Sequence, residues 1–235
     1  MGQENSQLEG VGQMPSLVAL AHELKAPLGL IRHLALCRDY YDQAEQTAAL
    51  RRIELASERA LRLVEALGLS YRLQDLTSEP INLNCLCLDI AHELTPLCVE
   101  SDQKIELKLP RQPLLGLGNR DLLSSVVFGL CDNAFSYGSA GQPIKLHVSR
   151  HSQNARVAVY DHGPGVVKSQ LKSLRQRLGK APQPLSNRPG SSGLGLYIAG
   201  QFAEAMQGEL GVRQSLKSGQ SFYIDIPRST QLSLI

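Results

Sequence analysis

RVAVYDHGPG, the stretch at residues 156–165, runs from a strand-like segment directly into a glycine-containing turn. A carboxylate at the end of a strand can hydrogen-bond a ligand, and glycines after it let the backbone approach that ligand closely. Asp161, Gly163 and Gly165 are therefore candidates for a binding pocket. A plain Asp-x-Gly turn without a ligand is the alternative that this stretch alone leaves open.

A second glycine-rich segment, GSSGLGL at residues 190–196, opens a helix predicted over about 193–206. Glycines at a helix N-terminus expose N–H groups to a phosphate, and the helix dipole favours the negative charge. Gly193, Leu194 and Gly195 are the candidates here, although a lone G-x-G is a common turn. The chain has neither a G-x-G-x-x-G motif nor a P-loop.

The tripeptide Asp132-Asn133-Ala134 lies inside a helix predicted over about 119–137. The amide oxygen of Asn133 is a suitable ligand for Mg²⁺, a hard cation that prefers oxygen. A solvated Asp-Asn pair is the alternative.

A long loop is predicted between Val166 and Ser192, because the segment holds three prolines and little apolar periodicity. No Asp or Glu occurs between His162 and Ala203, whereas this span contains six Lys or Arg residues. A wholly cationic loop between two glycine motifs is suited to closing over a triphosphate. The alternative is a solvated basic loop with no ligand.

Two amphipathic helices joined by a polar connection are predicted near the N-terminus. Apolar residues recur at steps of three and four from Leu17 to Ala35, and the pattern returns from Leu50 to Leu67. Such helices form an antiparallel hairpin, and each has more apolar surface than the other can cover. Pairing two hairpins into a four-helix bundle would bury the remainder, so we expect a homodimer.

The pattern changes after Pro80. Strand-like alternation at residues 105–109, 144–148 and 222–226 is interleaved with helical segments, which predicts an α+β fold. The expected organisation is a polar tail at 1–15, a helical hairpin at 16–77, an α/β domain at 78–229 with a lid at about 166–192, and a C-terminal tail at 230–235.

The first hairpin helix carries HELKAP at residues 22–27. His22 falls one residue past the apolar position Ala21, so its ring is expected at the edge of the bundle, within reach of solvent. Pro27 removes a backbone hydrogen bond and is expected to bend the helix. Ala26 stands where a zinc-protease H-E-x-x-H motif needs histidine, which excludes that class. A surface histidine without a function is the alternative.

Composition excludes other classes. The chain is 43% apolar and 20% charged, as is ordinary for a globular protein. A net charge of +2 does not indicate nucleic-acid binding. The longest nearly apolar run, at residues 122–131, is far shorter than the roughly 20 residues of a membrane span. The five cysteines form no C-x-x-C pair and are expected as reduced thiols in the cytoplasm.

Taken in order, these segments resemble the core of the sensor histidine kinases. Residues 21–28 resemble the H box of that family, 132–134 its N box, and 161–165 and 193–196 its two glycine boxes. Order and spacing match over about residues 14–228. The resemblance implies a dimerisation and histidine-phosphotransfer hairpin, followed by an ATP-binding α/β sandwich of the histidine kinase and Hsp90 type.

The resemblance also implies residue roles. His22 would be the phospho-acceptor, with Glu23 as the adjacent acid. Asn133 would ligate Mg²⁺, Asp161 would recognise the adenine amino group of ATP, and Leu194 and the glycines of both glycine boxes would shape the pocket.

The sequence departs from the family at a few positions. Gly129 stands where the N box usually has a further Asn, Ser136 where a basic residue is usual, and Ser191 where the second glycine box begins. His92 lies in a tetrapeptide like that of His22, but its proline comes one residue earlier and no second hairpin helix follows. His22 is therefore preferred.

The resemblance implies a histidine kinase that phosphorylates His22 from Mg-ATP and transfers the phosphoryl group to an aspartate of a response regulator receiver domain. Input from an upstream sensor protein is expected, and a nucleic-acid partner is not. One alternative is a phosphotransfer or scaffold protein with a degenerate ATP domain, and another is a clamp-type ATPase of the same fold. The intact Asp161 and the glycine pairs oppose the former, and the H box opposes the latter.

Overall fold

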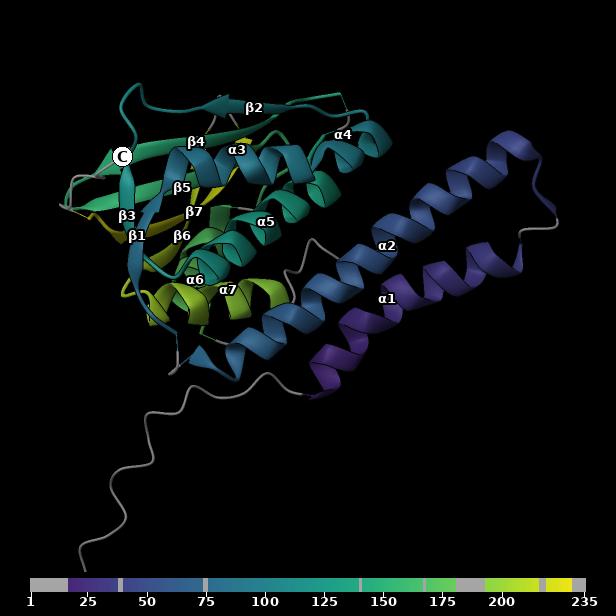
Figure 1. Ribbon diagram of the computed structural model, residues 1–235, viewed down its shortest axis with the longest axis horizontal. Coiled ribbons are helices and arrows are strands. Elements are labelled where there is room, and N and C mark those ends of the chain that lie inside the picture. The colour runs from purple at the N-terminus through teal and green to yellow at the C-terminus, as the bar shows by residue number, and fades with distance from the viewer. Residues whose placement is uncertain are drawn as a thin grey trace, which may run out of the picture.

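The computed structural model describes residues 17–37, 40–73, 76–139, 141–166, 168–180, 193–215 and 219–229. A helical hairpin extends from one side of an α/β part (Figure 1). The tails expected at 1–15 and 230–235 lie outside the described residues, as does most of the second half of the expected lid. Among the residues described, no helix is both long and apolar enough to cross a membrane.

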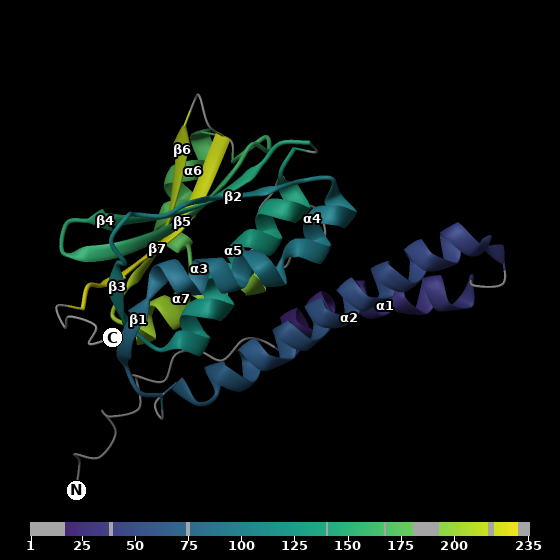
Figure 2. The ribbon, with the colours of Figure 1, turned by 45° about the horizontal axis from the view of Figure 1, so that its top comes forward.

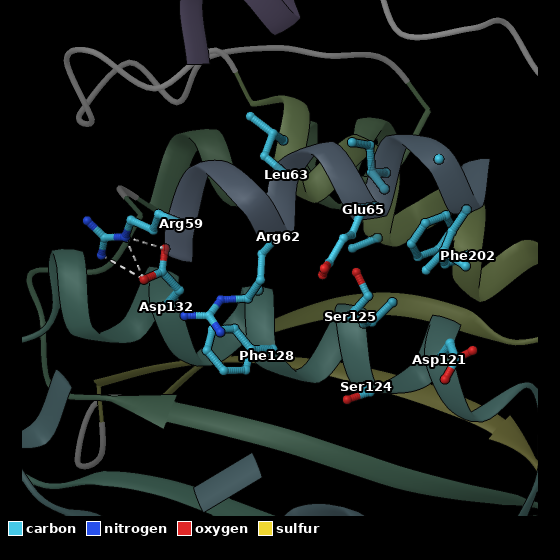
Figure 3. Close-up of a pocket in the computed structure, with 18 of the residues that line it drawn as sticks. Arg59, Arg62, Leu63, Glu65, Asp121, Ser124, Ser125, Phe128, Asp132 and Phe202 are labelled. Atoms are coloured by element: carbon cyan, nitrogen blue, oxygen red, sulfur yellow. Dashed lines mark hydrogen bonds and ion pairs between the residues drawn. The ribbon is translucent and has the colours of Figure 1, made fainter. Parts of the chain in front are cut away.

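The hairpin consists of α1 (Leu17–Leu36) and α2 (Gln43–Ser70), which pack side by side. α2 begins with a capping box, because the Asp42 carboxylate accepts from the Glu45 N–H at 2.8 Å and the Glu45 carboxylate accepts from the Asp42 N–H at 2.9 Å. The predicted helical hairpin is present. Towards its C-terminal end α2 lies against α5 and α7 of the α/β part (Figure 3).

The two hairpin helices leave apolar surface uncovered. Leu34 of α1 and Ala49 and Ala56 of α2 are buried. Several large apolar side chains remain exposed on the same two helices. Leu28, Leu50 and Val64 belong to the repeating pattern that predicted the hairpin, and the others are Val18, Leu30, Leu36 and Leu61. The expected surplus of apolar surface is therefore present in the single chain.

The α/β part contains two sheets. Strands β1 (Glu79–Asn82) and β3 (Leu115–Gly118) pair antiparallel. The larger sheet has the order β2-β4-β5-β7-β6, in which β2 and β4 are parallel and the other neighbours are antiparallel. Its strands are β2 (Ile105–Lys108), β4 (Ile144–His151), β5 (Asn154–Asp161), β6 (Glu209–Ser215) and β7 (Gly219–Pro227).

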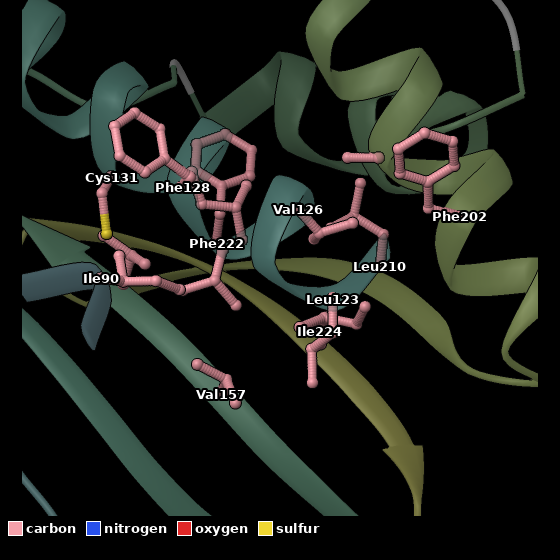
Figure 4. Close-up of a cluster of buried hydrophobic side chains, with 14 of the residues drawn as sticks. Ile90, Leu123, Val126, Phe128, Cys131, Val157, Phe202, Leu210, Phe222 and Ile224 are labelled. Carbon is pink, nitrogen blue, oxygen red and sulfur yellow. The ribbon is translucent and has the colours of Figure 1, made fainter. Parts of the chain in front are cut away.

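Helices cover one face of the larger sheet, which makes a two-layer sandwich (Figure 2). The helices of this part are α3 (Leu83–Glu93), α4 (Thr95–Ser101), α5 (Arg120–Tyr137), α6 (Lys168–Arg177) and α7 (Leu194–Ala205). α3, α5 and α7 pack on the strands, and the core between the layers includes Leu123, Val157 and Phe202 (Figure 4). The predicted α+β fold is confirmed.

The structure corrects the expected loop over residues 166–192, because its first part forms α6. Leu171, Leu174 and Leu178 are spaced three and four residues apart and pack on the core, so one helical face is apolar despite the surrounding cations. Further along the chain, α3 and α4 are separated at Leu94, where Pro96 lies in the new first turn.

The five cysteines are free thiols in different environments. Cys87 and Cys131 are buried, Cys37 and Cys98 are half-buried, and Cys85 is exposed. Burial raises the pKa of the Cys87 thiol to about 12 and raises the pKa of the Cys131 thiol as well. Because the thiolate is the reactive form, these two thiols should be inert in the folded chain.

We therefore predict that iodoacetamide at mildly alkaline pH alkylates Cys85 in the native protein, but Cys87 and Cys131 only after denaturation. Peptide mapping by mass spectrometry with and without urea measures this directly. Native alkylation of Cys131 at the rate of Cys85 would contradict the burial described here.

Candidate functional site

Asp161 ends β5 and is 4% exposed. Its Oδ1 accepts a hydrogen bond from the Gly163 N–H at 2.9 Å, which folds the chain into a tight turn. A Cβ on Gly163 would collide with the carbonyl oxygen of Tyr137, at the end of α5. Ser139 Oγ donates to the carbonyl oxygen of His162 at 2.7 Å. The first glycine motif is thus held against the C-terminal end of α5, and only glycine fits there.

The sheet places a buried amide beside Asp161. Asp161 pairs with Gln220 of β7, which in turn pairs with Gln214 of β6, so the three side chains share one face. Gln220 is 0% exposed, and within the described residues neither atom of its amide has a hydrogen-bond partner. A Cβ on Gly165, whose φ is +65°, would lie 3.4 Å from Gln220 Oε1.

A buried amide without partners costs about 1–3 kcal/mol, so its presence calls for a specific explanation, of which a bound ligand is one. Gln220 is a candidate that the sequence did not predict, because only the pairing of β5 with β7 brings it next to Asp161. No local sequence motif around Gln220 indicates that it lies next to Asp161.

The second glycine motif begins α7. Gly193, its N-cap residue, has a left-handed φ of +75° and no side chain with which to cap the helix. Leu194 is completely buried and anchors the first turn in the core, whereas a Cβ on Gly195 would meet none of the described residues within 4 Å. The N-terminus of α7 therefore combines a fixed backbone with open space beside it, as an anion-binding helix end requires.

α5 connects the two glycine motifs, because it packs against both β5 and α7. It begins at Arg120, where the Asn119 side chain accepts from the N–H groups of Asp121 and Leu122 at 3.1 Å. Asn133 is half-buried in its C-terminal half. The predicted N box and both predicted glycine boxes thus lie on elements that contact one another.

Asn133 can supply one oxygen to a metal ion. No hydrogen bond or ion pair of its side chain is seen among the described residues, whereas Asp132 is bound by Arg59. Within the residues that the structure describes, no group of three or more His, Cys, Asp or Glu side chains is placed to hold a metal ion. Mg²⁺ commonly binds proteins through one or two ligands together with substrate phosphates and water, so a single amide oxygen such as that of Asn133 is compatible with it.

An interdomain pocket of about 600 Å³ lies between α2 on one side and α5 and α7 on the other (Figure 3). Arg59, Asp132 and Gly195 are among its lining residues, so it reaches both the N box and the second glycine motif. Asp161 is not part of its lining. The pocket is therefore next to the N-terminus of α7 and away from the buried Asp161 carboxylate.

His22 is exposed on α1, as the spacing predicted, and the neighbouring Glu23 is half-buried. Leu20, two residues earlier, packs against the buried core cluster, to which α2 contributes Ala66 and Leu67 beside the α/β part, and α1 contacts α7. His22 thus lies at the end of the hairpin that touches the α/β part, but it does not line the interdomain pocket. His92 is exposed near the end of α3.

A family model described as histidine kinase-, DNA gyrase B-, and HSP90-like ATPase matches residues 118–230. Sensor protein kinase PmrB of Pseudomonas aeruginosa is 29% identical over 215 residues, which are 89% of this chain and 44% of PmrB. Sensor histidine kinase RppB of Synechocystis sp. is 29% identical over 214 residues, 88% of this chain and 47% of RppB. The chain thus spans less than half the length of these relatives.

Solved structures share the fold. A crystal structure of full-length ShkA in complex with AMPPNP has a TM-score of 0.61 at 23% identity and covers 93% of this chain and 47% of ShkA. Acinetobacter baumannii histidine kinase AdeS has a TM-score of 0.55 at 21% identity, over 89% of this chain and 98% of that one. Residues 118–230 match the model of the histidine kinase-, DNA gyrase B-, and HSP90-like ATPases, and the chain is similar to sensor histidine kinases over nearly nine tenths of its length.

Proposed function

We propose that this chain binds Mg-ATP, transfers the γ-phosphoryl group to His22 and then passes it to an aspartate of a response regulator receiver domain. The observation that carries the proposal is the buried Asp161, hydrogen-bonded to Gly163 in a turn that packs against the helix of Asn133. The match to sensor histidine kinases over nearly nine tenths of the chain supports it further.

ATP would lie between the two glycine motifs. The Asp161 carboxylate would accept a hydrogen bond from the adenine amino group, and the adjacent Gln220 amide offers a donor and an acceptor to the ring. The N-terminus of α7 would bind phosphate oxygens. Mg²⁺, when bound through Asn133 and the phosphates, would neutralise charge on the transferring group.

The step at His22 is a phosphoryl transfer. The unprotonated ring nitrogen attacks the γ-phosphorus, the bond from that phosphorus to the bridging oxygen breaks, and ADP leaves with the bonding electrons. Neutral imidazole is a competent nucleophile near pH 7. Glu23, the next residue along α1, would accept the proton from the other ring nitrogen. Exposure of His22 lets both the ATP domain and a partner protein reach it.

The acting form would be a homodimer. Leu28 of α1 and Leu50 and Val64 of α2 are each more than half exposed in the part of the chain that the structure describes. Burial of one such side chain stabilises by roughly 1.5–3 kcal/mol, so two hairpins gain by pairing into a four-helix bundle. The five free thiols agree with a cytoplasmic location.

A scaffold with a degenerate ATP domain is the rival function, favoured by Gly129 and Ser136 in the N box. Incubation with γ-labelled ATP separates the two. Label that appears on the protein and is lost in acid but stable in alkali identifies phosphohistidine and supports the kinase. A chain that binds no fluorescent ATP analogue and takes up no label would be the scaffold.

Ala26 leads to a prediction about the reverse reaction. It is exposed on α1, four residues after His22, where the resembled family often has Thr or Asn thought to position the water that dephosphorylates the regulator. Alanine offers neither donor nor acceptor. We predict kinase and transfer activity with weak phosphatase activity, and a gain of phosphatase activity in Ala26→Thr.

The measurement is the decay of a purified phosphorylated regulator with and without the kinase and ADP. Ala26→Ser serves as a control for the hydroxyl group alone. If the unmodified chain accelerates the decay as strongly as Ala26→Thr, the prediction is wrong.

A further inference from the structure

Arg59 of α2 reaches across to the N box on α5. Its Nε donates to Asp132 Oδ1 at 2.8 Å, and its Nη2 donates to the same oxygen at 2.6 Å and to Ser136 Oγ at 2.9 Å. Figure 3 shows Arg59 and Asp132 joined by these contacts at one end of the interdomain pocket. Arg59 of the hairpin therefore binds two residues of α5, one directly before Asn133 and one three residues after it.

Two nitrogens of the Arg59 guanidinium are held by hydrogen bonds, and the third is available to a ligand. Nε and Nη2 are fixed by Asp132 and Ser136, and no contact of Nη1 is seen among the described residues. Guanidinium carries five N–H donors in a rigid plane. The side chain is 43% exposed, so its remaining donors are accessible to a ligand.

The position of Arg59 relates it to the phosphates. Arg59 lines the interdomain pocket together with Gly129, Asp132 and Gly195, and Gly195 lies in the first turn of α7. The N-terminus of α7 is the end that favours an anion. Arg59 therefore borders the same space as the backbone that would bind phosphate.

The distribution of charge on α5 explains why a cation is needed at the position of Arg59. After Arg120, α5 has no Lys or Arg, and it carries Asp121 and Asp132. A triphosphate beside Asn133 would be repelled by the neighbouring Asp132 carboxylate unless a cation neutralised it. Within the described residues, Arg59 provides that cation, and it also contacts Ser136.

We propose that Arg59 is a nucleotide-binding residue contributed by the hairpin: held by Asp132 and Ser136, its guanidinium contacts the phosphates of ATP. This inference rests on the proposed function. It adds a consequence, because the same arginine joins α2 to α5, so that nucleotide binding and contact between hairpin and ATP domain are thermodynamically linked.

The experiment compares the affinities of ATP, ADP and adenosine for the purified full chain with Mg²⁺, by calorimetry for the nucleotides and ligand-observed NMR for adenosine. Arg59→Ala should weaken ATP and ADP about tenfold, the range expected for a charge-assisted hydrogen bond. Adenosine affinity should not change, since it lacks phosphates. Arg59→Lys should retain part of the affinity, and Arg51→Ala, an exposed arginine on the same helix, should change nothing.

A second experiment asks whether a guanidinium placed elsewhere, on α5, restores the ATP affinity. In the Arg59→Ala background, S136R introduces a guanidinium one turn after Asp132 and should restore most of the ATP affinity. Unchanged ATP affinity in Arg59→Ala, or an equal loss for adenosine, overturns the inference while leaving the proposed function intact. Failure of the unmodified chain to bind ATP and adenosine overturns the proposed function, and this inference with it.

Discussion

Replacing His22 with glutamine should abolish self-phosphorylation while ATP binds as tightly as in the unmodified chain. Glutamine keeps a polar side chain of similar length but has no nucleophilic ring nitrogen. His22 is exposed on α1 and does not line the interdomain pocket, so neither folding nor the nucleotide site depends on it. Incorporation of label from γ-labelled ATP, measured beside the affinity for a fluorescent ATP analogue, tests both halves of the expectation.

Two other histidines provide matched controls. His33 is exposed on the same helix, and His92 is exposed on α3 in the tetrapeptide that resembles that of His22. His33→Gln and His92→Gln should take up label at the unmodified rate. Equal labelling of His22→Gln and the unmodified chain would reject His22 as the acceptor, and loss of label in His92→Gln would assign the role to His92.

Local periodicity predicted the hairpin because each helix repeats its apolar residues every three or four positions over many turns. The polar connection contains its own start signal, the capping box at Asp42 and Glu45. In the α/β part, Asp161 and the glycines could be selected because a carboxylate at a strand end followed by a glycine turn is a local pattern. The structure gives that pattern a cause, the close approach of Gly163 to Tyr137.

Features that depend on contacts between distant segments were not predictable. The segment of α6 is predicted as loop because three prolines and little apolar periodicity mark residues 166–192, and the apolar stripe of its leucines has meaning only against the core. Short strands such as β1 and β3 exist because they pair with each other across more than thirty residues of chain. Gln220 and Arg59 belong to the same class, since their partners lie on other elements.

Asp161→Asn should weaken ATP binding by more than tenfold without unfolding the chain. Asparagine has the size of aspartate, so the buried end of β5 can keep its packing, and Asn Oδ1 can still accept from the Gly163 N–H. In that orientation the new amide presents its NH₂ where the carboxylate had an acceptor. Two donors, the amide and the adenine amino group, then face each other, and the lost charge-assisted bond is worth roughly 1.5–3 kcal/mol.

The same geometry predicts an opposite effect of Asp161→Asn on the affinity for a second nucleotide. Inosine triphosphate carries a carbonyl oxygen where ATP carries the amino group, and that oxygen repels a carboxylate but accepts from an amide. The unmodified chain should therefore prefer ATP to inosine triphosphate, and Asp161→Asn should narrow or reverse the preference. Asp89→Asn, at an exposed position of α3 that pairs with Arg120, is the matched control and should leave both affinities unchanged. If Asp161→Asn binds both nucleotides as the unmodified chain does, Asp161 only forms the turn, and the base is recognised elsewhere.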